Sequence, residues 1–274
     1  MASPPPARPD RPARPDLPAR PHRPASRWRA GVRIARLALL FILCLPPHLI
    51  ARIGGRRSPW PRRFLARAAH IAGTRVTVVG EALSPHSLVI ANHTSWLDIL
   101  ILGGATGTRF VSKAEVERVP LIGWLSDQNH TLYIERAERG DAHGQVRRIA
   151  AALADQQPLA VFPEGTTSNG RALLAFRSTL LHAVAPPPPG TSVRPIAIDY
   201  GDSIDAVAWH GGEPGLTNAV RVLGLKGRRR VTVRLLAALP ATSDRKALAR
   251  EARAAITAAL PSLAPRDTLE RATS

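Results

Sequence analysis

From residue 75 onward, short apolar and β-branched runs alternate with helix-length apolar patterns, and this alternation constrains the fold more than any other feature. It is typical of an α/β layered domain with a largely buried sheet. We therefore predict one layered domain in which helices flank a mostly parallel or mixed central sheet. The predicted strands cover residues 76–79, 88–90, 109–111, 131–134, 159–162, 193–198 and 230–236. The predicted helices follow residue 93, begin at residue 141, cover 172–184, and run from about 243 to 260.

The most informative stretch is residues 92–98, Asn-His-Thr-Ser-Trp-Leu-Asp, which joins a buried strand to an apolar helix. We expect that helix to start near residue 97, with Thr94 or Ser95 as its cap, and to end at residues 103–104, both glycine. The histidine of the stretch would then lie at a strand-to-helix turn.

His93 and Asp98 form a candidate acid–base pair within this stretch. Residues five apart on one helix point about 140° away from each other, so the His93 ring reaches Asp98 only from outside the helix. A carboxylate in contact would fix the imidazole tautomer and leave the other nitrogen free to take a proton. Taken alone, the pair is more simply explained as a buried or capping histidine and a first-turn acid, and only the rest of the chain reverses this preference.

The charge of the chain is concentrated at its N-terminal end. There are 38 lysines and arginines against 20 acidic residues, a formal net charge of +18. The first 67 residues hold 15 of the arginines and only two acids. Because this basic end accompanies an apolar stretch, and no RNA-binding signature is present, it favours an anionic membrane surface over nucleic acid. Cys44 is the only cysteine, so a disulfide within the chain is impossible.

The N-terminal region divides by composition. We expect residues 1–30, with nine prolines, to be a disordered Pro/Arg-rich tail, and residues 31–70 to form membrane-interface helices. The uninterrupted apolar run, residues 37–45, is shorter than the roughly 20 residues that span hydrocarbon, and the prolines at 46–47 should break its helix. A core-packing helix beside a solvated basic segment is the alternative. The main domain would cover residues 71–262, followed by a C-terminal tail over 263–274.

Polar residues follow two other predicted strands. Glu164, Gly165 and Thr166 open a turn after residues 159–162, where glycine allows close backbone approach and the polar groups could contact a head group. Arg136 follows residues 131–134 and could grip a phosphate, although a surface ion pair is the plainer reading. No Gly-x-Ser-x-Gly elbow, P-loop or metal-ligand cluster is present, so we expect direct attack by a substrate hydroxyl and no metal.

Four stretches, in order, resemble the glycerolipid acyltransferase family, specifically the 1-acyl-sn-glycerol-3-phosphate (lysophosphatidic acid) acyltransferase type. They are residues 92–98, similar to its His-x4-Asp block, and residues 133–136, 162–166 and 193–197, similar to its second, third and fourth blocks. The match covers about residues 75–200. Thr167 stands where the family often has arginine, and residues 167–170 and 176–178 look more like bacterial members that acylate lyso-ornithine lipid.

The resemblance implies transfer of a fatty acyl group from acyl-CoA or acyl-acyl-carrier-protein to a lysolipid hydroxyl, converting 1-acyl-sn-glycerol-3-phosphate to phosphatidic acid in phospholipid biosynthesis. It implies no cofactor beyond the acyl co-substrate. By resemblance, His93 is the general base and Asp98 its orienting partner. The thioester oxyanion needs hydrogen-bond donors, and the backbone N–H groups at the start of the following helix are a candidate. The implied substrate-binding residues are Arg136, Glu164, Gly165 and Thr166 at the head group, Lys113 as a further head-group contact, and Pro195 near the acyl donor.

Three alternatives stay open. The acceptor could be lyso-ornithine lipid or another lysolipid, the protein could be a catalytically silent lipid-binding membrane protein, or it could bind nucleic acid through its charge. We expect membrane lipids, the lysolipid and the acyl donor as partners, no specific nucleic acid, and a location on the cytoplasmic face of a bacterial inner membrane. The sequence sets no oligomeric state.

Overall fold

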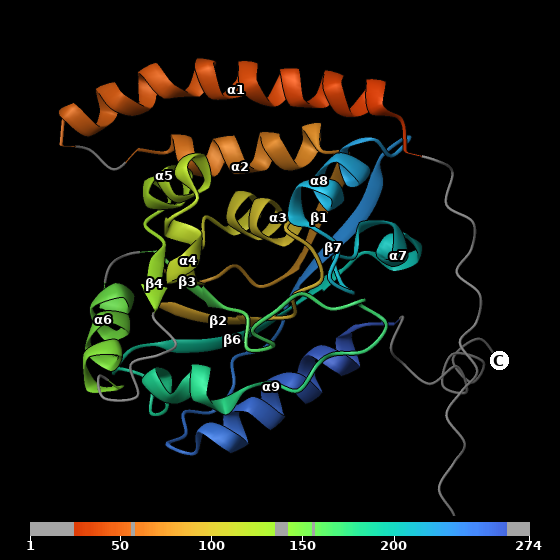
Figure 1. The fold of residues 1–274 in the computed structure, drawn as a ribbon. Helices are drawn as coiled ribbons and strands as arrows, with labels where there is room; N and C mark the ends of the chain where they lie inside the picture. Colours follow the sequence, from red (N-terminus) through yellow and green to blue (C-terminus); the bar gives the residue numbers. More distant parts are fainter. Residues whose placement is uncertain (1–24, 56–57, 135–141, 155–156, 262–274) are drawn as a thin grey trace, which may run out of the picture.

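The computed structural model describes residues 25–55, 58–134, 142–154 and 157–261, and its centre is a mixed sheet (Figure 1). Seven strands lie in the order β1-β7-β6-β2-β5-β3-β4, and every neighbouring pair is parallel except β6 and β7. The strands are β1 (Thr74–Gly80), β2 (Ser87–Ala91), β3 (Arg109–Lys113), β4 (Leu132–Ile134), β5 (Leu159–Val161), β6 (Ser192–Asp199) and β7 (Arg229–Leu235). The predicted layered α/β architecture and all seven predicted strands are confirmed.

Helices cover both faces of the sheet. They are α1 (Arg27–Ile53), α2 (Trp60–Ile71), α3 (Leu97–Thr106), α4 (Ala114–Glu117), α5 (Pro120–Gln128), α6 (Ala142–Ala154), α7 (Ile204–Val207), α8 (Gly215–Leu223) and α9 (Arg245–Ala259), with 3₁₀ turns η1 (Ser178–Val184) and η2 (Gly201–Ser203). Successive β2 side chains point to opposite faces. Val89 and Ala91 pack in the core cluster that includes residues of α2, α3 and α8, whereas Leu88 and Ile90 pack with α6 and α9.

The prediction that Pro46 and Pro47 would break the first helix is wrong. Helix α1 runs unbroken for 27 residues along α2 (Figure 1). Tertiary contacts hold the turn beyond the prolines: His48 is buried, and its ring nitrogens lie 2.8 Å from Ser58 Oγ and 3.0 Å from Gln128 Oε1. The helix also begins at residue 27, inside the segment expected to be a tail.

By length and composition α1 could cross a membrane, although a soluble core helix or a signal sequence can pass the same test. Only 17% of its most apolar window is buried inside the protein. Its exposed large apolar side chains are Trp28, Ile34, Leu39, Ile42, Leu43, Leu49, Ile50 and Ile53. The alternative predicted from the sequence is a helix packed against the core of the protein. That alternative fits α2 and the inner side of α1, but it does not fit the exposed apolar side of α1.

Helix α3 does not end at Gly103 and Gly104, as predicted, but continues to Thr106, and Gly107 adopts a left-handed conformation (φ 74°) after it. The two inner glycines serve close packing instead. A Cβ on Gly104 would lie 2.5 Å from the backbone of Ala66, so α2 and α3 approach closely there.

The predicted helix over residues 172–184 is also wrong, because only the 3₁₀ turn η1 forms in its second half. The backbone N–H of Leu174 donates to the Glu164 carboxylate, and that of Arg177 donates to the carbonyl of Pro163. In a helix starting at residue 172 the N–H of Leu174 would need no intrahelical partner, but that of Arg177 would donate to residue 173, and here it is committed to the loop after β5.

Candidate active site

The site lies at the carboxyl ends of neighbouring parallel strands. Strand β2 pairs with β5 on one side and β6 on the other, so the residues that follow the three strands meet at one edge of the sheet. His93 follows β2, Phe162 follows β5, and Tyr200 follows β6.

His93 and Asp98 are in contact, as the spacing argument requires. Because α3 begins at Leu97, His93 lies outside the helix, and its Nδ1 is 2.9 Å from Asp98 Oδ2. The Asp98 carboxylate is fully buried, whereas 18% of the His93 side chain is exposed. The other ring nitrogen, Nε2, makes no hydrogen bond to the described part of the chain. The imidazole is thus held at one nitrogen and open at the other.

Asp98 is a hub of hydrogen bonds. Its Oδ2 also accepts the backbone N–H groups of Thr94 (2.7 Å) and Ser95 (2.9 Å), and its Oδ1 accepts the hydroxyl of Tyr200 (2.5 Å). The expected cap is present in part: the Ser95 hydroxyl accepts the N–H of Leu97, the first residue of α3, at 3.4 Å, whereas the Thr94 side chain makes no such bond. Asp98 in turn accepts from the backbones of both residues. Burial, with the Asp98 charge second, raises the pKa of Tyr200 well above its usual range, so this phenol stays a donor.

Because Asp98 occupies the N–H groups of Thr94 and Ser95, these two groups are not available to an oxyanion. Thr94 and Ser95 precede α3, so the expectation that N–H groups at the start of the helix bind the oxyanion stays a prediction for the groups that follow them.

Glu164 links two loops from inside the protein. It is 1% exposed, its Oε1 accepts the N–H of His93 (2.7 Å), and its Oε2 accepts the N–H of Leu174 (2.9 Å). Burial raises the pKa of Glu164, against the lowering effect of these two hydrogen bonds. In this position the carboxylate braces the turn that carries His93.

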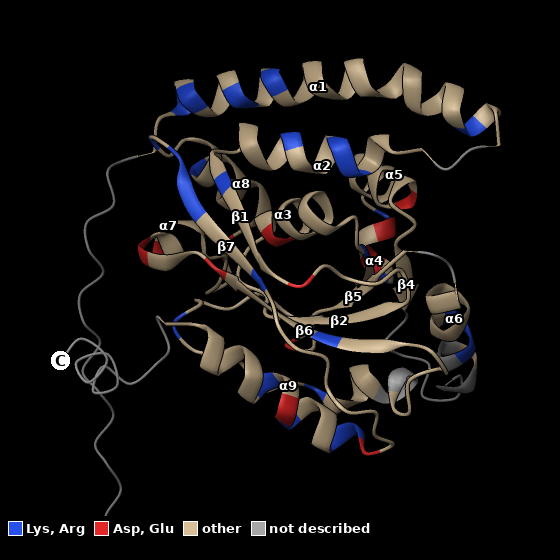
Figure 2. Cartoon of the chain, turned by 180° about the vertical axis from the view of Figure 1, so that it is seen from behind, with Lys and Arg blue, Asp and Glu red and all other residues tan. Residues whose placement is uncertain are grey.

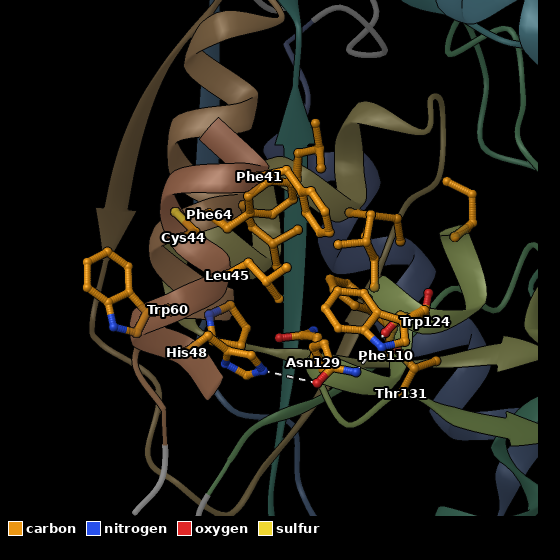
Figure 3. A pocket seen from close by; sticks show the side chains of 18 of the residues that line it. Phe41, Cys44, Leu45, His48, Trp60, Phe64, Phe110, Trp124, Asn129 and Thr131 are labelled. Atoms are coloured by element: carbon orange, nitrogen blue, oxygen red, sulfur yellow. Dashed lines mark hydrogen bonds between the residues drawn. The ribbon is translucent and has the colours of Figure 1, made fainter. Parts of the chain in front are cut away.

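An aromatic stack connects His93 to an apolar cavity. The His93 ring lies 4.3 Å from the Phe162 ring and nearly parallel to it, and Phe162 stacks on Phe110 at 5.9 Å. Phe110 lines a cavity of about 240 Å³ between α1, α2, α3 and α5. Figure 3 shows the side chains from these helices that surround it, including those of Phe41, Phe64 and Trp124.

The structure brings some predicted substrate-binding residues to this edge. Gly165, in a left-handed conformation (φ 70°), and the exposed Thr166 form the turn directly after Pro163 and Glu164. Lys113, half-buried, ends β3 and pairs in register with Ile134.

Of the two remaining predicted residues, one is placed differently and the other is not among the described residues. Pro195 is buried within β6 and pairs in register with Ile90 of β2, which precedes His93 by three residues. Pro195 therefore lies inside the sheet rather than at its edge. Arg136 lies outside the described residues. Within the described ranges, no group of three or more histidines, cysteines and acidic residues could hold a metal ion.

Sequence reasoning did not identify Tyr200, Phe162 or Ser168 as site residues. Ser168 fixes the turn, because its backbone N–H and its hydroxyl both donate to the His93 carbonyl (3.0 and 3.3 Å). Tyr200 could have been found from its place directly after a predicted strand parallel to that of His93. No sequence signal indicated that its hydroxyl would meet Asp98.

Comparisons with known proteins agree with this geometry. Residues 75–199 match the family model described as Acyltransferase. The lyso-ornithine lipid O-acyltransferase of Pseudomonas aeruginosa is 39% identical over 220 residues, which cover 79% of this chain and 83% of that protein. The 1-acyl-sn-glycerol-3-phosphate acyltransferase of Neisseria gonorrhoeae is 33% identical over 115 residues, 42% of this chain and 44% of that protein.

A crystal structure shares the fold. The 1-acyl-sn-glycerophosphate acyltransferase of Thermotoga maritima superposes with a TM-score of 0.61 at 18% identity, over 85% of this chain and 95% of that one. Together with the His93–Asp98 site and the matched sequence blocks, these similarities establish that the chain belongs to the acyltransferase family and is an O-acyltransferase of the lysophospholipid acylation type.

Proposed function

We propose that this enzyme transfers a fatty acyl group from an acyl thioester, acyl-CoA or acyl-acyl-carrier-protein, to the free hydroxyl of lyso-ornithine lipid, with His93 as the general base. The observation that carries the proposal is the contact between His93 Nδ1 and the buried Asp98 carboxylate, which leaves Nε2 open.

The proposed chemistry follows from this pair. A buried carboxylate only accepts hydrogen bonds, so Nδ1 carries the proton and Nε2 carries the lone pair. Nε2 takes the proton of the lysolipid hydroxyl as its oxygen attacks the thioester carbonyl. The resulting imidazolium is stabilised by the Asp98 charge and returns the proton to the departing thiolate. Base catalysis of this kind contributes about 10²–10⁴ in rate.

The apolar cavity is a candidate binding site for the fatty acyl chain. Its walls are almost wholly apolar, and its Phe110 side joins the stack that ends on the His93 ring. We propose that an acyl chain lies in this cavity while its reacting end faces His93.

The acceptor is proposed from sequence similarity. The relative with 39% identity carries the name lyso-ornithine lipid O-acyltransferase, and the shared region covers most of both chains. 1-Acyl-sn-glycerol-3-phosphate, the main acceptor expected from the sequence, is the second candidate. It is supported by the name of the Neisseria relative, which matches over less than half of this chain.

The site residues predicted by resemblance keep proposed roles. We propose that Gly165, Thr166, Lys113 and Arg136 surround the head group. Glu164 would support substrate binding indirectly, by holding the turn that carries His93 through its hydrogen bonds, and Pro195 would do so through the packing of β6. The exposed apolar side of α1 supports a location at the membrane, where lysolipids reside.

The experiment compares the wild type with His93→Ala, and with His86→Ala as a matched control, because His86 is exposed on the loop before β2. Purified enzyme is incubated with lyso-ornithine lipid or 1-acyl-sn-glycerol-3-phosphate and each acyl donor, and products are identified by mass spectrometry.

We expect His93→Ala to lose at least about 100-fold in rate while thermal unfolding stays near that of the wild type. The control should keep full activity. A folded His93→Ala enzyme with normal turnover would disprove the mechanism and favour the silent lipid-binding alternative. If the enzyme prefers 1-acyl-sn-glycerol-3-phosphate to lyso-ornithine lipid, then 1-acyl-sn-glycerol-3-phosphate is the acceptor and the proposed acceptor is wrong.

A further inference from the structure

Five arginines gather where the start of α1 meets the turn between α8 and β7, and we call this group the arginine cluster. Its members are Arg29, Arg33, Arg36, Arg228 and Arg229. Figure 2 shows the blue segments of the first turns of α1 close to the blue start of β7. The two elements are joined by contacts between α1 and α8 and by the hydrogen bond from Ser26 N to the carbonyl of Gly224 (3.0 Å).

Two guanidinium groups form the centre of the cluster. Arg33 donates to the carbonyls of Leu223 (2.8 Å) and Gly227 (3.1 Å), and Arg229 donates to those of Gly73 (3.0 Å) and Gly227 (3.2 Å). A Cβ on Gly73 would lie 2.3 Å from Arg229 NH2 and 2.7 Å from Arg33 NH2. The backbone thus holds two like charges side by side at a glycine.

No acidic side chain in the described ranges forms a salt bridge with any member of the cluster. Arg229 is 6% exposed, and its buried Nε has no hydrogen-bond partner. Burial, followed by the charge of Arg33, lowers the pKa of Arg229 to about 10. Buried charges are normally paired, so a cluster of like charges with no acidic partner in the described ranges would be stabilised by an anion that binds its exposed members.

The surroundings indicate which anion. Arginine binds phosphate oxygens through parallel N–H groups, and Arg36 and Arg228 are exposed and make no hydrogen bond to the described residues. Along α1, the exposed apolar side chains of Ile34 and Leu39 lie directly beside the cluster in sequence. A lipid presents this combination, a phosphate at the edge of an apolar layer.

We propose that the arginine cluster binds the phosphate of an anionic phospholipid headgroup at the membrane on which α1 lies. The site is separate from the catalytic pair, and it would hold one end of α1 at the level of the lipid phosphates.

The test uses the full chain and co-sedimentation with vesicles of phosphatidylcholine alone or of phosphatidylcholine with phosphatidylglycerol. Arg36→Gln/Arg228→Gln removes two exposed charges of the cluster and no hydrogen bond within the described structure. Lys246→Gln/Arg250→Gln is the matched control, because it removes the same charge from exposed positions of α9, on the other side of the sheet (Figure 1). A second arm adds inorganic phosphate at constant ionic strength and follows both thermal unfolding and vesicle binding.

Each arginine near an anionic surface contributes about fivefold in binding, so the cluster variant should bind phosphatidylglycerol vesicles roughly 25-fold more weakly than the wild type. The α9 variant should bind like the wild type, and inorganic phosphate should not displace the protein. Equal losses in the two variants would overturn the proposal, because net charge alone would then explain binding. Stabilisation by inorganic phosphate that the cluster variant lacks, with no preference for phosphatidylglycerol, would also overturn it by assigning the site to a soluble phosphate.

Discussion

Tyr200→Phe removes one oxygen atom from the buried site and leaves its aromatic ring in place. The lost hydroxyl is the donor to Asp98 Oδ1, whereas Oδ2 keeps His93 and the N–H groups of Thr94 and Ser95. The substitution therefore tests whether protein stability and the support that Asp98 gives to His93 depend on the hydrogen bond from Tyr200 as well as on the remaining donors.

A hydrogen bond to a charged group contributes about 1.5–3 kcal/mol, and the buried carboxylate of Asp98 cannot replace the lost donor with bulk water. We expect the free energy of unfolding at pH 7 to fall by about 2 kcal/mol. For a chain of this size, that corresponds to a fall of about 4–8 °C in Tm. The pKa of Tyr200 is raised, so its contribution to stability is fully present below about pH 10 and is lost only at higher pH.

Thermal unfolding and acyl-transfer rates are measured for the wild type, Tyr200→Phe and Tyr133→Phe. Tyr133, which is half-buried, is the only other tyrosine. Its hydroxyl lies 3.2 Å from the carbonyl of Gly123 and also donates to an aspartate, Asp127 (2.9 Å), through a solvent-exposed hydrogen bond. Exposed hydrogen bonds contribute less, so we expect Tyr133→Phe to cost no more than about 1 kcal/mol. Since Asp98 keeps its contact with His93, kcat of Tyr200→Phe should fall by about tenfold or less.

A Tyr200→Phe protein as stable as Tyr133→Phe and as active as the wild type would contradict a role of Tyr200 in holding Asp98. Asp98 would then be held by His93 and by the backbone N–H groups of Thr94 and Ser95, without a contribution from Tyr200. A loss of activity as large as that expected for His93→Ala would also contradict it, because Tyr200 would then act on the substrate rather than through Asp98.

Other predictions address the hydrogen bonds of Glu164, the close contact between α2 and α3 at Gly104, and the apolar cavity. Glu164→Gln should cost about 1–3 kcal/mol, because its amide nitrogen would face one of two buried N–H donors. The pKa of Glu164 is raised, so the advantage of the wild type over this variant in urea unfolding should be larger near pH 4 than near pH 7, and an equal advantage would contradict this. Gly104→Ala should destabilise by about 1–3 kcal/mol through its clash with Ala66, whereas Gly31→Ala, which meets no atom within 4 Å, should not destabilise. Leu100→Trp should narrow the cavity and shift preference to shorter acyl donors, as competition between donors would reveal; an unchanged preference would exclude the cavity as the acyl site.

The sequence predicted the strands better than the helices, for a physical reason. Buried strands such as residues 87–91 are apolar on both faces and stand out from polar turns. Helix α5 was missed because only Pro120 at its start marks it. The helix predicted over residues 172–184 does not form because the N–H of Arg177 donates to the carbonyl of Pro163, far earlier in the chain. Such long-range use of backbone donors leaves no local pattern.

The contact between His93 and Asp98 could be predicted, because it depends on one turn and one helix start. The other parts of the site come from elsewhere in the chain. Tyr200 reaches Asp98 across 102 positions, and Glu164 reaches His93 across 71. The place of Glu164 after a strand and the family resemblance predicted a contact with substrate, but its burial between two N–H donors could be known only from the folded chain.

The proline pair inside α1 limits how deep that helix can lie. Pro46 and Pro47 have no N–H, so the carbonyls of Ile42 and Leu43 lack their usual partners one turn earlier, and both residues are 62% exposed. In hydrocarbon each unsatisfied carbonyl would cost several kcal/mol, whereas water or lipid headgroups satisfy it. We therefore expect α1 to rest flat at the boundary of a single leaflet, with its midsection within reach of hydration, rather than to pass through to the other side.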